Sequence, residues 1–161
     1  IIAAVNGVAA GAGASLAMTC DIAIAAPGAS FIQAFSKIGL VPDSAGTFFL
    51  PRLIGFQKAM AVMMLGDKVT AAEALQMGMI YKVFAAADFE AEVVKLATTL
   101  SQMPTKALGL TKRLLNESMT NNLEQQLALE SELQIEAAST SDYNEGVTAF
   151  VEKRTPLFTG N

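Results

Sequence analysis

The fold of this chain is decided by residues 6–47, whose sequence is NGVAAGAGASLAMTCDIAIAAPGASFIQAFSKIGLVPDSAGT. This stretch runs from a glycine-rich turn, between an expected strand and an expected helix, to Asp43 in an otherwise uncharged loop. Small residues at a helix start leave backbone N–H groups open to a negatively charged oxygen. We expect an oxyanion-binding turn that faces the carboxylate of Asp43.

Short strands and helices alternate along the first part of the chain. Apolar periodicity and turn residues predict strands over 1–5, 21–25, 30–34 and 80–84 and helices over 14–19, 44–50, 56–65, 70–78 and 89–101. After Pro104 the patterns are helical only, over 105–117, 123–138 and 142–153, with an irregular tail. We therefore place a boundary near Met103, with residues 1–103 as an α/β part and residues 104–161 as a helical region.

Composition excludes several classes of protein. Of 161 residues, 52% are apolar and only 16% are charged. A small monomer cannot easily bury that much apolar surface, so we expect an oligomer. The net charge of −4 without a dense Lys/Arg block argues against nucleic acid as a partner. The single cysteine, Cys20, fits a reducing, cytoplasmic compartment, and the lack of histidine removes His triads and His metal sites. No metal-ligand pattern is present, so no metal site is expected.

The uncharged run of residues 1–20 raises the question of a membrane segment. Gly7 and Gly11 even have the spacing of a helix-packing motif. Asn6 and the glycines interrupt the run, however, Asp21 follows it directly, and no basic stretch precedes it as in a signal peptide. We expect no membrane partner.

The glycine turn by itself is open to several interpretations. A dinucleotide fingerprint requires a third glycine where Leu16 stands, and a phosphate-binding loop requires a Gly-Lys-Ser/Thr ending that is missing. An oxyanion hole requires only well-placed N–H groups, to which Ala12 and Gly13 allow close approach. Tight packing of helix on strand explains the small residues equally simply, and spacing alone favours it.

Asp43 also has two interpretations. It is the only charged residue between Lys37 and Arg52, and a carboxylate removed from water in such a loop becomes a stronger base. Alternatively, Asp43 or Ser44 caps the helix expected over 44–50 by accepting its free N–H groups. The sequence pattern does not separate a base from a cap.

Four stretches together resemble the enoyl-CoA hydratase/isomerase family, also called crotonases. They are AAVNGVAAGAGASLAMTCDIAIAAPGASF (3–31), KIGLVPDSAGTFFLPRLIG (37–55), GDKVTAAEALQMGMIYKVF (66–84) and AFVEKRTPLFTG (149–160). The resemblance implies the second half of a ββα spiral core, followed by C-terminal helices that build trimers, often paired into hexamers. It also implies that roughly another hundred residues precede this start within the same domain, supplying a second oxyanion N–H and much of the coenzyme A site.

The resemblance further implies an acyl-CoA substrate and a set of site residues. The Ala12 N–H holds the thioester oxygen, Gly11 and Gly13 bind substrate beside it, Asp43 is the catalytic carboxylate, and Phe150 and Lys153 help a neighbouring subunit close the coenzyme A site. The positions of the two glutamates of family hydratases hold Ser15 and Phe35. Because neither activates water, an isomerase is expected rather than a hydratase.

The implied reaction is proton transfer through an oxyanion-stabilised thioester enolate. The run over residues 30–55 is similar to the branch of the family that converts ring-1,2-epoxyphenylacetyl-CoA to oxepin-CoA, and conversion of 3-enoyl-CoA to 2-enoyl-CoA is the other substrate choice. Coenzyme A enters with the substrate, and no separate cofactor is implied. A hydratase-like relative and an inactive assembly module remain the alternatives.

Overall fold

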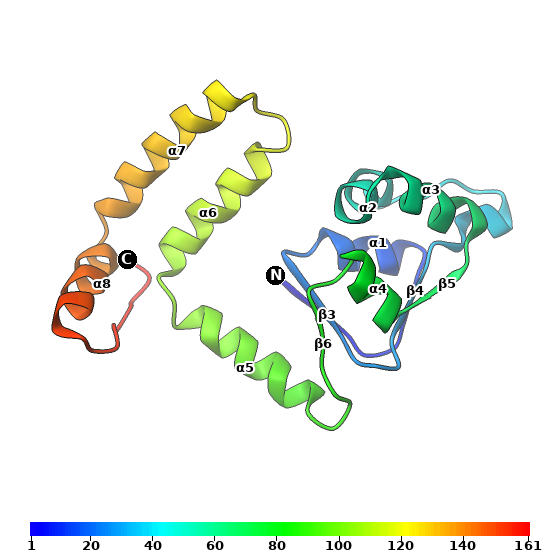
Figure 1. Cartoon of the computed structure of the whole chain (residues 1–161), viewed down its shortest axis with the longest axis horizontal. Helices are drawn as coiled ribbons and strands as arrows, with labels where there is room; N and C mark the ends of the chain where they lie inside the picture. The colour runs from blue at the N-terminus through cyan, green and yellow to red at the C-terminus, as the bar shows by residue number, and fades with distance from the viewer. The chain divides into compact units, whose positions relative to one another are not determined.

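The computed structural model describes all residues, 1–161, and divides the chain into two compact units, Ile1–Val94 and Lys95–Asn161 (Figure 1). The division falls inside helix α5 (Phe89–Ser101), whose bounds agree with the predicted helix. The functional division near Met103, into a spiral core and an oligomerisation region, stays a prediction.

Unit 1 contains six short strands in two three-stranded sheets, ordered β1-β3-β6 and β2-β4-β5. They are β1 (Ile2–Val5), β2 (Val8–Ala10), β3 (Ile22–Ala25), β4 (Ser30–Ile32), β5 (Lys68–Thr70) and β6 (Lys82–Val83). All pairs are parallel except β4 with β5, which is antiparallel.

The strand pairing in the two sheets shows two stacked turns of a spiral. In the first sheet Ile2 pairs with Ile22, and in the second Val8 pairs with Ser30. The Asn6-Gly7 turn leads from the first sheet to the second, and Pro27-Gly28 does the same one turn later. Each turn thus places one strand in each sheet, which confirms the expected α/β spiral architecture.

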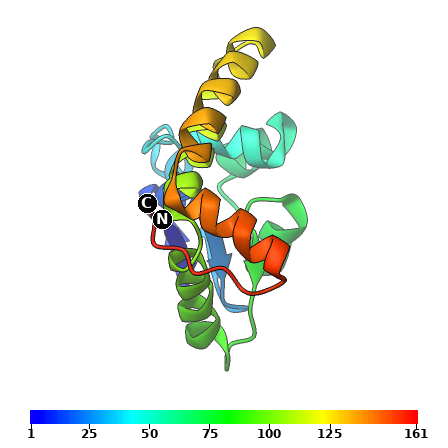
Figure 2. The ribbon, with the colours of Figure 1, turned by 90° about the vertical axis from the view of Figure 1, so that its left-hand side faces the viewer.

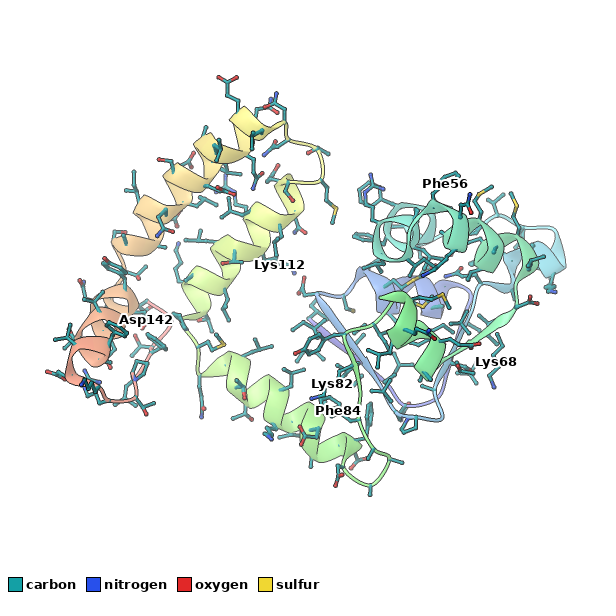
Figure 3. All side chains as sticks on the ribbon, viewed as in Figure 1. Phe56, Lys68, Lys82, Phe84, Lys112 and Asp142 are labelled. Atoms are coloured by element: carbon teal, nitrogen blue, oxygen red, sulfur yellow. The ribbon has the colours of Figure 1, made fainter.

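Helices follow the strands of each turn. Unit 1 holds α1 (Ala12–Thr19), the 3₁₀ helix η1 (Ala34–Ile38), α2 (Gly46–Ile54), α3 (Phe56–Leu65) and α4 (Ala71–Met77). The core gathers buried side chains of α1, β4, α2 and β5, among them Met18, Phe31, Leu50 and Val69. Phe56, at the start of α3, points outward instead and is exposed (Figure 3).

Local sequence rules placed several elements correctly. The bounds of α3 agree with the predicted helix, and Thr70 and Glu73 form the expected capping box, with Gly78 ending α4. The Thr70 hydroxyl and then its backbone N–H donate to Glu73, and these bonds lower the pKa of that carboxyl. Such interactions lie within four residues, so sequence alone reveals them.

Other predictions were wrong at the ends of elements. Ala12 opens α1 instead of lying in a loop, and the third strand ends at Ile32, where the chain turns into η1. Ser44 does not cap α2, which begins only at Gly46. Strands β2 and β5 were missed, because three residues are too few to display a period.

Unit 2 is helical, as predicted for the chain after Pro104. Its helices are α6 (Thr105–Glu117), α7 (Leu123–Ala138) and α8 (Ser141–Glu152). Helices α6 and α7 lie side by side, joined by a short turn, and Asn122 and Gln125 form a capping box at the start of α7 (Figure 1). After Lys153 the tail folds back along α8 (Figure 2).

Candidate active site

The predicted oxyanion turn begins at Gly11. Its backbone has φ of 52°, a left-handed value that suits glycine, and the Phe35 ring lies 3.6 Å from where a Cβ would stand. The Gly11 N–H donates to Ile32 at 2.8 Å, and its carbonyl accepts from Ser15 at 3.1 Å. These bonds tie the end of β2 to β4 and fix where α1 starts.

The first turn of α1 presents the N–H groups that the sequence singled out. Ala12 and Gly13 occupy its first two positions, where no i−4 carbonyl exists inside the helix. Ala12 is half-buried and Gly13 is exposed. The helix dipole favours negative charge at this end. The turn therefore has the chemistry of an oxyanion site, and the assignment of Ala12 stays a prediction.

Asp43 lies in the loop before α2. Its side chain is exposed to solvent in this chain, so the prediction that the carboxylate is buried away from water is wrong. The expected capping role is wrong as well, because Ala45 occupies the N-cap position of α2 and no side chain bonds there. Instead the Asp43 carbonyl accepts from the Gly46 N–H at 2.9 Å. This bond uses the backbone and not the carboxylate, whose role as a base stays a prediction.

The residues after Asp43 adopt an uncommon conformation. Ser44 and Ala45 have φ of 49° and 60°, both in the left-handed region. Non-glycine residues pay a steric penalty there, and such strain is concentrated at functional sites. The strained turn directs the chain from Asp43 into α2.

Helix α2, which follows the Asp43 loop, packs on α1, which follows the oxyanion turn. A Cβ added to Gly46 would lie 2.6 Å from the Ser15 hydroxyl oxygen, which shows how closely the two helices approach. Ser15 lies one turn after Ala12, and Gly46 is bonded to the Asp43 carbonyl. The chain segments that carry the oxyanion turn and Asp43 therefore meet where α2 packs on α1, and a shared site stays a prediction.

Ser15 and Phe35, which the resemblance places at the glutamate positions of family hydratases, are both buried. Ser15 is fully buried in α1, and Phe35 packs its ring near Gly11. Sequence reasoning missed Gln33, which is 1% exposed and whose Nε2 donates to the Ser15 hydroxyl at 3.3 Å. Gln33 stands between the buried Phe31 and Phe35 in an alternating pattern, and this break in the apolar alternation was the available clue.

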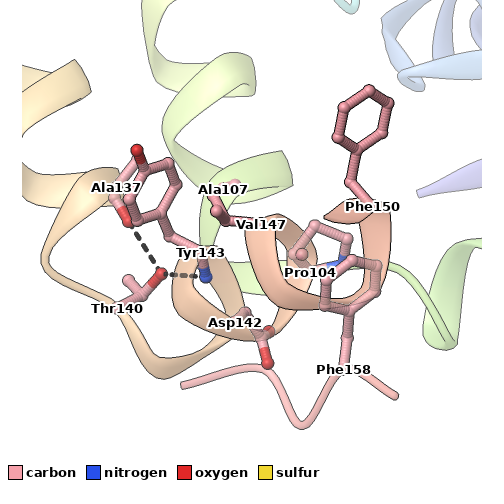
Figure 4. Close-up of a pocket in the computed structure, with 10 residues that line it drawn as sticks. Pro104, Ala107, Ala137, Thr140, Asp142, Tyr143, Val147, Phe150 and Phe158 are labelled. Carbon is pink, nitrogen blue, oxygen red and sulfur yellow. Dashed lines mark hydrogen bonds between the residues drawn. The ribbon is translucent and has the colours of Figure 1, made fainter. Parts of the chain in front are cut away.

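The predicted coenzyme A residues lie in unit 2, at the end of α8. Phe150 is 85% exposed and borders a 390 Å³ pocket (Figure 4). Lys153 is exposed and caps α8 in a left-handed conformation with φ of 56°. The other lining residues are mainly apolar: Pro104, Ala107, Ala137, Thr140, Asp142, Tyr143, Gly146, Val147 and Phe158.

Asp142, one of the lining residues, anchors the tail beside this pocket. It is 3% exposed, lies at the start of α8 (Figure 3), and accepts from the N–H groups of Thr159 and Gly160 at 2.7 and 2.8 Å. The tail thereby carries Phe158 against Gly146, whose Cβ position is 3.5 Å from the ring. Sequence reasoning treated the tail as irregular and missed this anchor.

Two further properties concern ligands and membranes. No group of three or more Cys, Asp or Glu side chains is arranged to hold a metal ion. None of the helices combines the length and the apolar character needed to cross a bilayer.

Comparison with known proteins identifies the family. The model of the enoyl-CoA hydratase/isomerase family matches residues 1–161, and the chain belongs to this family. It is 48% identical over 160 residues to a 1,2-epoxyphenylacetyl-CoA isomerase of Escherichia coli K12, and 46% identical over 160 residues to a Rhodobacter capsulatus protein named "Probable enoyl-CoA hydratase". In each case 99% of this chain is covered.

Solved structures agree with this family. The crystal structure of an enoyl-CoA hydratase from Polaromonas sp. JS666 superposes with a TM-score of 0.93 at 39% identity, over 98% of this chain and 62% of that one. The chain spans 61–62% of the length of the two curated relatives.

Proposed function

We propose that the whole protein is an acyl-CoA isomerase. The Ala12 N–H holds the thioester oxygen, with Gly11 and Gly13 beside the substrate, and Asp43 removes a carbon-bound proton. The electron pair of the broken C–H bond moves into the enolate, whose charge rests on the bound oxygen. Asp43 then returns the proton at another carbon, and the double bond has moved without net consumption of any co-reactant.

The observation that carries this proposal is the approach of Gly46 to Ser15. This approach supports the pairing of Asp43 with Ala12, because Ser15 lies one helical turn after Ala12 and the Gly46 N–H is bonded to the Asp43 carbonyl. A base and an oxyanion hole on the same side of a thioester are sufficient for proton transfer.

The residues near Asp43 and Ala12 disfavour the addition of water to the substrate. The hydration chemistry of the family relies on two glutamates, and Ser15 and Phe35 stand in their places. Both are buried, and neither accepts a proton from water. One carboxylate suits a proton shuttle better than the activation of water, which normally requires a second acid or base.

The acyl group is proposed to be apolar. Ile38, Leu40 and Val41 precede Asp43 and are 72%, 59% and 80% exposed, so they are available to an apolar substrate. The E. coli relative named 1,2-epoxyphenylacetyl-CoA isomerase supports a ring epoxide of phenylacetyl-CoA, converted to oxepin-CoA, as the first substrate to test. A linear 3-enoyl-CoA is the second.

Coenzyme A binding and assembly complete the proposal. Phe150 and Lys153 of one subunit are proposed to close the coenzyme A site of a neighbour in a homotrimer or hexamer, in the cytoplasm. Exposed apolar side chains on α6 to α8 support assembly, including Leu115, Leu123, Leu127, Ile135 and Val151. No metal or redox cofactor takes part in the proposed reaction. Native mass spectrometry of the whole protein distinguishes trimer from hexamer.

The test is an assay of the whole protein with a 3-enoyl-CoA and with the ring epoxide, comparing wild type, Asp43→Asn and the exposed-surface control Asp67→Asn. Loss of the proton acceptor should lower kcat by at least about 100-fold, while the control keeps it. Isomerisation that survives Asp43→Asn removes Asp43 from the mechanism.

The same samples distinguish the alternatives. The Rhodobacter relative supports a hydratase, so crotonyl-CoA is assayed in parallel for the 3-hydroxy product. Formation of that product by the wild type without isomerisation would establish a hydratase. A protein that assembles but converts none of the three substrates would favour an assembly role.

A further inference from the structure

A buried polar pair lies beneath the candidate site. Ser15 and Gln33 are 0% and 1% exposed, and the Gln33 Nε2 donates to the Ser15 hydroxyl at 3.3 Å. The other amide atom of Gln33, Oε1, is buried without a hydrogen-bond partner. Burying a polar group without full compensation is unfavourable, so stability does not explain why glutamine stands here.

The Ser15 hydroxyl also contacts the first residue of α2. A Cβ on Gly46 would lie 2.6 Å from the Ser15 oxygen and 3.4 Å from its Cβ. Only a residue without a side chain fits at the first position of α2 while Ser15 keeps its bond to Gln33. The Ser15 hydroxyl therefore lies directly in the contact between α1 and α2.

Gly46 also connects the start of α2 to Asp43. The Gly46 N–H donates to the Asp43 carbonyl at 2.9 Å, closing a turn of which Ser44 and Ala45 are the left-handed residues. A strained turn keeps its shape only where its surroundings hold it. A displacement of Gly46 would thus be passed to Asp43, while Ala12 stays fixed at the other end of the same turn of α1.

We propose that Ser15 and Gln33 are positioning residues that set the distance from the Asp43 carboxylate to the Ala12 N–H. The inference rests on the proposed isomerase function and assigns roles to two residues outside its catalytic pair. Proton transfer is sensitive to such geometry, since a misplacement of about 1 Å can lower the rate by about 100-fold.

The proposal is tested in the whole protein by kcat and KM for four variants. Gly46→Ala pushes the Ser15 hydroxyl away from Gln33 and should lower kcat about 10- to 100-fold with little change in KM.

In the double variant Ser15→Ala/Gly46→Ala, the new methyl group occupies the space left by the hydroxyl, so kcat should recover several-fold relative to Gly46→Ala. Gln33→Met removes the hydrogen bond at similar volume and should lower kcat even if Gly46→Ala folds poorly. Gly28→Ala, where no atom lies within 4 Å of the new Cβ, is the matched control.

Each outcome decides the inference. Loss of kcat that is restored in the double variant, while thermal unfolding temperatures of Gln33→Met and wild type stay similar, supports positioning. Unchanged kcat in Gly46→Ala and Gln33→Met, or losses that only follow the unfolding temperature with no recovery, overturn it. If the wild type isomerises substrate through Asp43 and the variants give those results, only the positioning role is refuted. A wild type that isomerises nothing refutes the proposed function, and this inference falls with it.

Discussion

The guanidinium of Arg154 donates two hydrogen bonds to the carboxylate of Glu145, at 2.6 and 2.8 Å. The same carboxylate accepts from the Leu157 N–H at 2.7 Å, and Arg154 also bonds Glu152 at 2.6 Å. Glu145 therefore joins the middle of α8 to the turn at its end and to the tail beyond.

The Arg154 hydrogen bonds, and then the Leu157 N–H, lower the pKa of Glu145 from 4.5 to about 2. A depressed pKa contributes stability above the unfolded value, and this contribution disappears as pH falls from about 4.5 through about 2. We expect the protection factors of the tail amides, which are exchange rates corrected for the intrinsic pH dependence of exchange, to fall over this window in wild type. Glu145→Gln should have lower protection factors already at neutral pH and a weaker pH dependence, whereas Glu130→Gln, on an exposed part of α7, should match wild type. Identical pH profiles for wild type and Glu145→Gln would contradict this role.

Asp142→Asn should loosen the tail. The carboxylate accepts from two backbone N–H groups, and replacement of one oxygen by an NH₂ donor leaves one of them without an acceptor in a buried place. The expected loss is about 1–3 kcal/mol in the free energy of unfolding of unit 2, seen in urea titration and as faster amide exchange at Thr159 and Gly160. Asp67→Asn is the control, because Asp67 is exposed and makes only a 3.9 Å ion pair with Lys37. Protection at Gly160 that equals wild type would show that the tail is held by other contacts.

Thr70→Ala should destabilise α4. The Thr70 side chain accepts from the Glu73 N–H at 3.3 Å and is one half of the capping box. Loss of a threonine cap lowers the free energy of unfolding by about 1 kcal/mol. Gln76→Ala, at an exposed position in the same helix, should leave stability within about 0.5 kcal/mol. Equal denaturation midpoints for the two variants would mean that β5 and α4 are held without the cap.

Ala45→Gly should stabilise the loop that carries Asp43. Ala45 has φ of 60°, and left-handed backbone costs a residue with a Cβ about 1–2 kcal/mol, while glycine adds about 0.4–1 kcal/mol of unfolded-state entropy. The net gain in the free energy of unfolding is about 0.5–1 kcal/mol, measurable by urea titration. Ala72→Gly, in the first turn of α4, is the opposite control and should destabilise by a similar amount. Lower stability of Ala45→Gly would show that the strain is relieved in solution.

The accuracy of the sequence predictions depended on the range of the interactions involved. The bounds of α3, α5, α6 and α7 agree with their predicted ranges, because caps, glycines and apolar periodicity lie within the helices themselves. Strands β2 and β5 escaped prediction, because three residues are too few to display a period and each strand is held by pairing with β4, far along the chain. The approach of Ser15 to Gly46 is such a long-range contact.

By itself, the sequence determined the spiral architecture, the family and the pairing of a glycine turn with Asp43 as a candidate site. Those features are carried by ordered motifs and by residue types that local chemistry explains. Only the tertiary structure decided that Asp43 is exposed, that Gln33 is buried against Ser15 and that Asp142 anchors the tail. Burial and hydrogen bonding between distant residues are properties of packing in three dimensions, and no local pattern encodes them.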